Sequence, residues 1–179
     1  LASTQLPRIC QQTDSQLIYV PMLLGGVFKA TGNASPVTIA AKGRYMFQDL
    51  ARYAKRYGVP LKFNPHFPIN TLTLMRAVTG MQLRHPERLE VFIDCLFRAL
   101  WVEGRNMDDP QTVAAVLTEH GFDPAETLAL TADEQVKTAL KDNTERAVQR
   151  GVFGAPSMFV GDQLFFGQDR LDFVVEALS

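Results

Sequence analysis

The last part of the chain constrains its fold more than any other segment. A long helical pattern ends at Gly151, and Pro156 stands directly before the strand-forming residues 157–160. The pair Gly161-Asp162 suits a two-residue hairpin turn, after which residues 163–166 form a returning strand. The sequence therefore predicts a β-hairpin that follows a long helix.

Helical periodicity dominates the rest of the chain. A closing helix is expected from Gly167-Gln168-Asp169 onward, and the opening residues LASTQLP resemble the inside of another helix. Residues 17–24 are apolar and β-favouring, which predicts a buried strand, and residues 29–36 and the proline-rich residues 61–70 are expected to be loops. Further helices are expected at residues 42–57, 71–83, 86–103, 110–120, 124–130 and 132–150.

This order of elements is typical of an α/β protein with a thioredoxin-like fold and a large all-helical insertion. The plan requires one strand before Leu1, and the chain opens without Met, so we expect the first strand and the active-site turn to lie upstream of the sequence given. Residues 1–36 and 132–179 would form the thioredoxin-like domain. Residues 37–131 would form the inserted helical domain.

Composition excludes several function classes. A net charge of −1 with dispersed Lys and Arg argues against nucleic-acid binding, and no apolar run reaches the ~20 residues that cross a membrane. Cys10 and Cys95 are far apart, form no CxxC, and are expected to be small buried hydrophobes in a reducing, cytoplasmic protein. The three histidines lack the spacing of metal ligands, so no metal site is expected.

Ala155-Pro156 admits two interpretations. A proline before a strand is ordinarily a device that starts the strand. A cis peptide bond at Pro156 would instead turn the backbone of Ala155 outward, where its N–H and C=O could pair with an extended peptide. A tripeptide that contains cysteine would suit such a site.

Longer runs carry a resemblance to a known family. The run VFGAPSMFVGDQLFFGQDRL resembles the C-terminal part of kappa-class glutathione transferases and 2-hydroxychromene-2-carboxylate isomerases, which are relatives of DsbA. The resemblance extends to residues 24–29, 31–33, 42–46 and 59–63 and to Asn70, so that it covers essentially the whole chain. It implies glutathione as the cofactor, a small electrophile as the substrate and a homodimer as the assembly.

The resemblance also implies a glutathione site. Ala155 would pair through its backbone with the cysteine of glutathione, beside a structural cis-proline at Pro156. Gln168 and Asp169 would bind the γ-glutamyl end, although the family usually has Ser or Asn where Gln168 stands. Elementary chemistry supports this placement, because the free backbone N–H groups at a helix N-terminus favour the carboxylate of a ligand. Asp169 by itself has a second interpretation, as an acidic residue that complements the helix dipole.

Four further residues match family positions. Asn33 and Lys42 would reach glutathione, Lys42 as a point charge for the glycyl carboxylate, although locally they read as a turn residue and a solvated lysine. His66 and Asn70 lie in the proline-rich loop where the isomerases place residues that face the substrate.

The catalytic residue is unknown from this sequence. In the family a serine before the first helix stabilises the glutathione thiolate, which is the nucleophilic form of the thiol. Matching LASTQLP to that helix puts the serine a few residues upstream of Leu1, and Ser3 and Thr4 lie too far into the helix to replace it.

The leading hypothesis is an enzyme, a glutathione-dependent protein similar to 2-hydroxychromene-2-carboxylate isomerase. It would activate the glutathione thiolate for addition to an electrophilic, aromatic-derived substrate. A kappa-class glutathione transferase or peroxidase is the main alternative. A DsbA-like thiol–disulfide oxidoreductase, which requires a CxxC, and a non-catalytic glutathione-binding module stay open.

Overall fold

A computed structural model describes residues 1–179, which divide into two compact units. The first unit comprises Leu1–Val20, Leu24–Pro60 and Glu145–Ser179. The second comprises Pro21–Leu23 and Leu61–Thr144. None of the helices is long and apolar enough to cross a bilayer.

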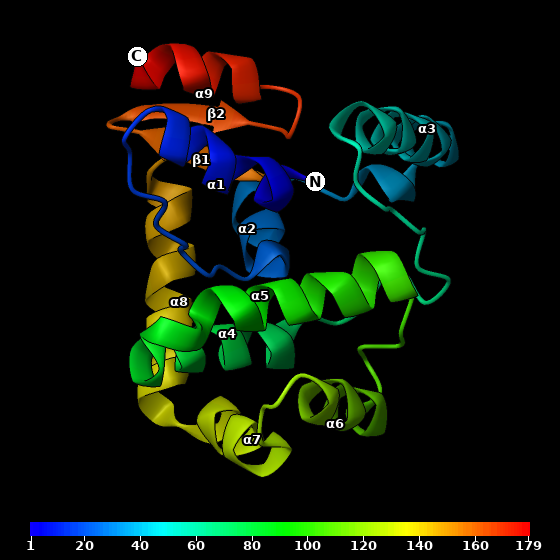
Figure 1. Ribbon diagram of the computed structural model, residues 1–179, viewed down its shortest axis with the longest axis vertical. Helices are drawn as coiled ribbons and strands as arrows, with labels where there is room; N and C mark the ends of the chain where they lie inside the picture. Colours follow the sequence, from blue (N-terminus) through cyan, green and yellow to red (C-terminus); the bar gives the residue numbers. More distant parts are fainter. The chain divides into compact units, whose positions relative to one another are not determined.

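The first unit is built around the predicted hairpin (Figure 1). Its elements are α1 (Ala2–Gln12), α2 (Leu24–Thr31), the 3₁₀ helix η1 (Pro36–Thr38), α3 (Ala40–Tyr57), β1 (Ser157–Val160), β2 (Gln163–Phe166) and α9 (Leu171–Leu178). Strands β1 and β2 are antiparallel, with Ser157 opposite Phe166 and Val160 opposite Gln163, which confirms the predicted hairpin. Gly161 has φ 56° at the turn, a conformation that glycine adopts without steric cost. Helix α9 packs against β1 and contacts α1, and Leu171 and Val174 of α9 are buried there.

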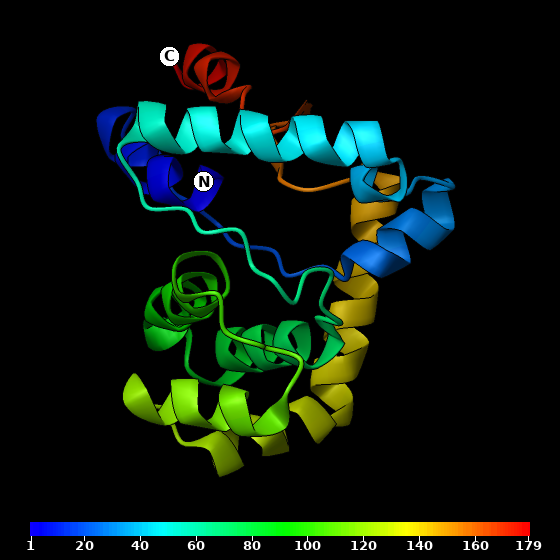
Figure 2. The ribbon, with the colours of Figure 1, turned by 90° about the vertical axis from the view of Figure 1, so that its right-hand side faces the viewer.

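The second unit is helical (Figure 2). It contains α4 (Leu72–Arg84), η2 (Pro86–Arg88), α5 (Leu89–Arg98), the π-helical turn η3 (Ala99–Glu103), α6 (Pro110–Glu119), α7 (Pro124–Ala132) and most of α8 (Glu134–Gln149). Helix α4 contacts both α5 and α7, and Gly80 permits the close approach to α7 because a Cβ there would lie 2.7 Å from the Leu130 Cβ. The rings of Phe92 and Phe122 meet edge to face with their centroids 4.9 Å apart.

The predicted caps of this unit are present. An Asp109 carboxylate oxygen accepts hydrogen bonds from the Thr112 hydroxyl and backbone N–H, at 2.6 and 2.9 Å, and these bonds lower the pKa of Asp109. Asp123 accepts the backbone N–H of Ala125 at 2.8 Å. Each aspartate satisfies N–H groups that the first turn of its helix leaves without a partner.

The predicted buried strand at residues 17–24 is wrong. Residues 15–23 have no regular secondary structure, and the side chains of Ile18 and Val20 are 69% and 60% exposed. A strand needs a neighbour to satisfy its backbone, and the only sheet in the structure is the β1–β2 pair. The predicted loop at residues 29–36 is also partly wrong, because α2 continues through Thr31.

Phe92 is the side chain on which the second unit's core most depends. Because Phe92 is fully buried, Phe92→Ala should lower the free energy of unfolding by about 3–5 kcal/mol. Its matched control is Val91→Ala, since the neighbouring Val91 is 61% exposed and its truncation should cost little. Urea unfolding followed by circular dichroism measures both, and equal losses would contradict this assignment of the core.

Candidate functional site

The loop before β1 holds Ala155 outward. The Ala155–Pro156 peptide bond is cis. Gly154 is buried against Phe166, and a Cβ on Gly154 would lie 2.7 Å from that ring, so a larger residue would require the ring to shift. The Gly167 backbone N–H donates to the Pro156 carbonyl at 3.0 Å. Ala155 itself is exposed, and its N–H and C=O have no partner in the chain.

Asn33 joins this loop from a distant part of the sequence. Its Nδ2 donates a hydrogen bond to the Phe153 carbonyl at 2.8 Å, and its Oδ1 accepts the Ala34 backbone N–H at 2.8 Å. The structure therefore brings Asn33 and the Ala155 loop together. Both polar atoms of the Asn33 side chain are used within the chain, so Asn33 holds the loop in position.

Gln168 and Asp169 follow the second strand on a tight turn. Gly167 has φ 99°, and α9 begins only at Leu171, so the pair precedes the helix rather than forming its first turn as predicted. The carboxylate of Asp169 pairs with the guanidinium of its neighbour Arg170. Gln168 is 92% buried, yet its Oε1 has no hydrogen-bond donor.

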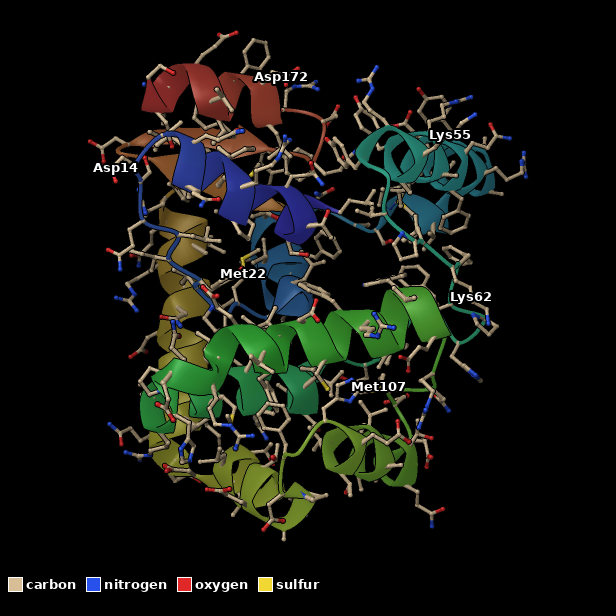
Figure 3. All side chains as sticks on the ribbon, viewed as in Figure 1. Asp14, Met22, Lys55, Lys62, Met107 and Asp172 are labelled. Atoms are coloured by element: carbon tan, nitrogen blue, oxygen red, sulfur yellow. The ribbon has the colours of Figure 1, made fainter.

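Tyr57 is a residue of this site that the sequence reading missed. It is the last residue of α3, and its hydroxyl donates to the Gln168 carbonyl at 2.9 Å. Burial is the main cause that raises the pKa of Tyr57, and nearby Tyr53 and Asp172 add to the shift, so the hydroxyl is protonated at neutral pH. Figure 3 labels Asp172 at the start of α9. The sequence pattern around Tyr57 indicates only that a helix ends before Gly58, so it does not predict the contact with Gln168.

Lys42 stands on the first turn of α3, in the same unit. Its side chain is exposed and has no hydrogen-bond or ion-pair partner in the chain. It is therefore available to an anionic ligand group. No contact within the chain directs it toward the Ala155 loop.

His66 and Asn70 belong to the second unit. His66 is exposed, and its backbone N–H donates to the Asn64 Oδ1 at 2.9 Å. Asn70 is also exposed, but its Oδ1 accepts the Leu72 backbone N–H at 3.1 Å where α4 begins. Of the two, His66 has the side chain that is available to a substrate, whereas Asn70 has a structural partner.

Buried Asn64 keeps the His66 loop in shape. Its Nδ2 donates to the carbonyls of Leu100 and Arg105, at 3.0 and 2.8 Å, and the side chain has no solvent exposure. The Phe67 ring lies 5.9 Å from the ring of Trp101 on η3. Figure 3 labels Lys62 and Met107, which belong to the same unit as this loop. No local sequence pattern indicates the role of Asn64, because both carbonyls that it binds are far away in the chain.

The cysteines differ from each other. Cys95 is buried, and burial raises the pKa of its thiol to about 11, so it is a thiol at neutral pH. Cys10 was expected to be buried as well, but it lies half-exposed in the last turn of α1 because it stands toward the edge of that helix's packed face. Neither cysteine has a partner for a disulfide.

Comparison with known proteins decides the family. Residues 1–179 match the DSBA-like thioredoxin domain. The chain belongs to this family. It is 30% identical to the 2-hydroxychromene-2-carboxylate isomerase of Sphingobium xenophagum, over 97% of this chain and 88% of that one. It is 29% identical to the human glutathione S-transferase kappa 1, over 89% of this chain and 76% of that one.

A solved structure agrees with these relatives. A 2-hydroxychromene-2-carboxylate isomerase superposes with a TM-score of 0.85 at 26% identity, covering 99% of this chain and 86% of the other. The thioredoxin-like DsbA fold and the resemblance to isomerases and kappa transferases are thereby confirmed. Because these relatives are isomerases and glutathione transferases, the chain is an enzyme of this kind.

The Tyr57–Gln168 bond gives a test of how this site is held. Tyr57→Phe removes the donor to the Gln168 carbonyl and should lower the free energy of unfolding by about 0.5–1.5 kcal/mol. Tyr53→Phe is the matched control on the same helix. Thermal or urea unfolding compares the two, and a Tyr53→Phe loss as large as that of Tyr57→Phe would show that the bond is not responsible.

Proposed function

We propose that this chain is a glutathione-dependent enzyme similar to 2-hydroxychromene-2-carboxylate isomerase. It binds glutathione at the Ala155 loop and adds the glutathione thiolate to an electrophilic, aromatic-derived substrate. The observation that carries the proposal is the outward backbone of Ala155, whose N–H and C=O lack partners beside a cis proline. Exposed backbone of this kind recognises an extended peptide by main-chain hydrogen bonds.

The peptide's ends have complementary groups available. In the proposed complex the glutathione cysteine pairs with the Ala155 backbone, and Asp169 meets the α-ammonium group of the γ-glutamyl residue. Gln168 would lie at the γ-glutamyl end beside Asp169, and its Oε1 is a buried acceptor without a donor in the chain. Lys42 would take the glycyl carboxylate, and Asn33 would act by holding the Phe153 carbonyl.

The type of reaction depends on what happens to the adduct between glutathione and the substrate. The thiolate adds to one carbon of an electrophilic carbon–carbon double bond: the carbon–sulfur bond forms as the π bond breaks, and the electron pair moves into the conjugated acceptor group. If rotation follows and the same bond breaks, the thiolate is released unchanged and the reaction is a cis–trans isomerisation. If the adduct instead takes up a proton and leaves the protein with its carbon–sulfur bond intact, the reaction is a conjugation. No residue among 1–179 is assigned as the group that stabilises the thiolate, and the raised pKa of Cys95 disfavours that residue as a nucleophile.

Kappa-class transferase activity is the second candidate. It is supported by the human relative, which is nearly as similar to this chain as the isomerase is. His66 is the residue that we propose to face the electrophile in either case. Asn70, four residues later, would support the loop through its bond to the Leu72 backbone N–H. The proposal includes a homodimer, and sedimentation velocity measures the assembly directly.

Binding tests the glutathione site. Calorimetric titration with glutathione should give a Kd between micromolar and millimolar, which corresponds to a binding free energy of roughly −8 to −4 kcal/mol. Asp169→Ala should weaken binding by about 1–3 kcal/mol, because it removes a charge-assisted contact. Asp172→Ala removes the same charge from the exposed first turn of α9 and should change affinity little. Absence of binding by the unaltered protein would refute the glutathione site.

Turnover separates the two candidate activities. With a 2-hydroxychromene-2-carboxylate and limiting glutathione, an isomerase should convert many equivalents of substrate while the free thiol concentration stays constant. A transferase should consume one thiol for each product formed. Isomerisation at the same rate without glutathione would rule out glutathione dependence, and catalysed reduction of a disulfide would favour the DsbA-like activity instead.

A further inference from the structure

A separate hollow lies between α1 and the end of α3, both in the first unit. Its volume is about 620 Å³, within the range of small-molecule sites. It is lined by Thr4, Gln5, Arg8, Arg56, Tyr57 and Val59. None of these residues was assigned a role by the sequence, and only Tyr57 also contacts the Ala155 site, through the Gln168 carbonyl.

Two arginines line the hollow without an acidic partner. Arg8 makes one long hydrogen bond, 3.5 Å, to the Gln5 Oε1, and the Arg56 guanidinium lies over the Tyr53 ring at 5.3 Å. Elsewhere in the chain, arginines such as Arg84 and Arg105 pair with carboxylates at 2.9 and 3.2 Å. Two uncompensated guanidinium groups in one concave site favour an oxyanion, because the planar guanidinium matches a carboxylate or phosphate with paired hydrogen bonds.

Gln5 supports one of these arginines from within α1. It is buried, and its two polar side-chain atoms are both used: Nε2 donates to the Thr4 hydroxyl at 3.0 Å, and Oε1 accepts from Arg8. The Thr4 hydroxyl in turn donates to the Leu1 carbonyl at 2.7 Å. The Arg8 side chain is therefore linked to a short hydrogen-bonded chain along the helix surface.

The apolar lining residues favour an organic anion over an inorganic one. Val59 and the ring of Tyr57 supply apolar surface, and the volume is far larger than a single phosphate or sulfate requires. Asp169 and Asp172 are near enough to affect Tyr57, but neither lines the hollow. An acid with an apolar body would use both the arginines and this wall.

We infer that the hollow binds an organic carboxylate, with its carboxylate between Arg8 and Arg56 and its apolar body against Val59 and the Tyr57 ring. The site is independent of the proposed glutathione site, which uses Ala155, Gln168 and Asp169. Asp169→Ala should weaken glutathione binding and leave binding of the organic carboxylate at the hollow unchanged, so each proposal can fail without the other.

Titration with benzoate tests this site, and benzamide serves as the uncharged probe of the same shape. In buffer that contains roughly 0.15 M salt, which screens distant surface charges, benzoate should bind and benzamide should bind at least tenfold more weakly. Arg8→Gln and Arg56→Gln should each weaken benzoate at least fivefold. Arg52→Gln is the matched control, because Arg52 is on α3 but pairs with Asp49 outside the hollow.

Four outcomes decide the inference. Amide shifts in ¹⁵N–¹H spectra confined to α1 and the end of α3, together with the affinity losses above, support it. Equal binding of benzoate and benzamide overturns it, as does an equal effect of Arg52→Gln and Arg56→Gln. Binding of inorganic phosphate as tight as that of benzoate overturns the choice of an organic acid and leaves a simple anion site.

Discussion

The close approach of the Phe166 ring to Gly154 is the contact on which the site depends. The missing side chain of Gly154 leaves room for the ring in its present position, which places the end of β2 directly against the loop that precedes β1. The Phe153 and Phe166 rings, which are tilted with their centroids 4.5 Å apart, and the Gly167-to-Pro156 hydrogen bond then secure the loop. With its neighbours held in this way, the Ala155 backbone is left facing outward.

Residues remote in sequence complete this frame. Asn33 fastens the Phe153 carbonyl from the loop after α2, and Tyr57 fastens the Gln168 carbonyl from the end of α3. Each of these side chains satisfies a backbone carbonyl, so each is a positioning group and leaves the Ala155 backbone and the Lys42 side chain available to a ligand. The first unit accordingly extends through Pro60 and includes all of α3.

The hollow between α1 and the end of α3 brings residues from these two helices to one surface. Tyr57 is common to both sites, because it lines the hollow and its hydroxyl also donates to the Gln168 carbonyl beside the Ala155 loop. The long separation of Arg8 and Arg56 in the sequence explains why no motif revealed the hollow.

Local patterns in the sequence were sufficient for the helices and the hairpin. Helical periodicity, aspartate caps and the Gly161-Asp162 turn are decided by interactions within a few residues, so their positions agree with the structure within a few residues. The sequence was also sufficient to indicate the family and the candidate residues between Ala155 and Asp169, because they lie in one continuous run of the chain.

Tertiary structure alone decided the remainder. Residues 17–24 have the composition of a strand but no partner strand to satisfy their backbone, and Ile18 and Val20 are exposed as a result. The roles of Tyr57 and Asn64 depend on carbonyl groups far away in the sequence, at Gln168 and at Leu100 and Arg105. A sequence pattern records what a residue is, whereas the partner of a buried or half-buried polar group exists only once the chain has folded.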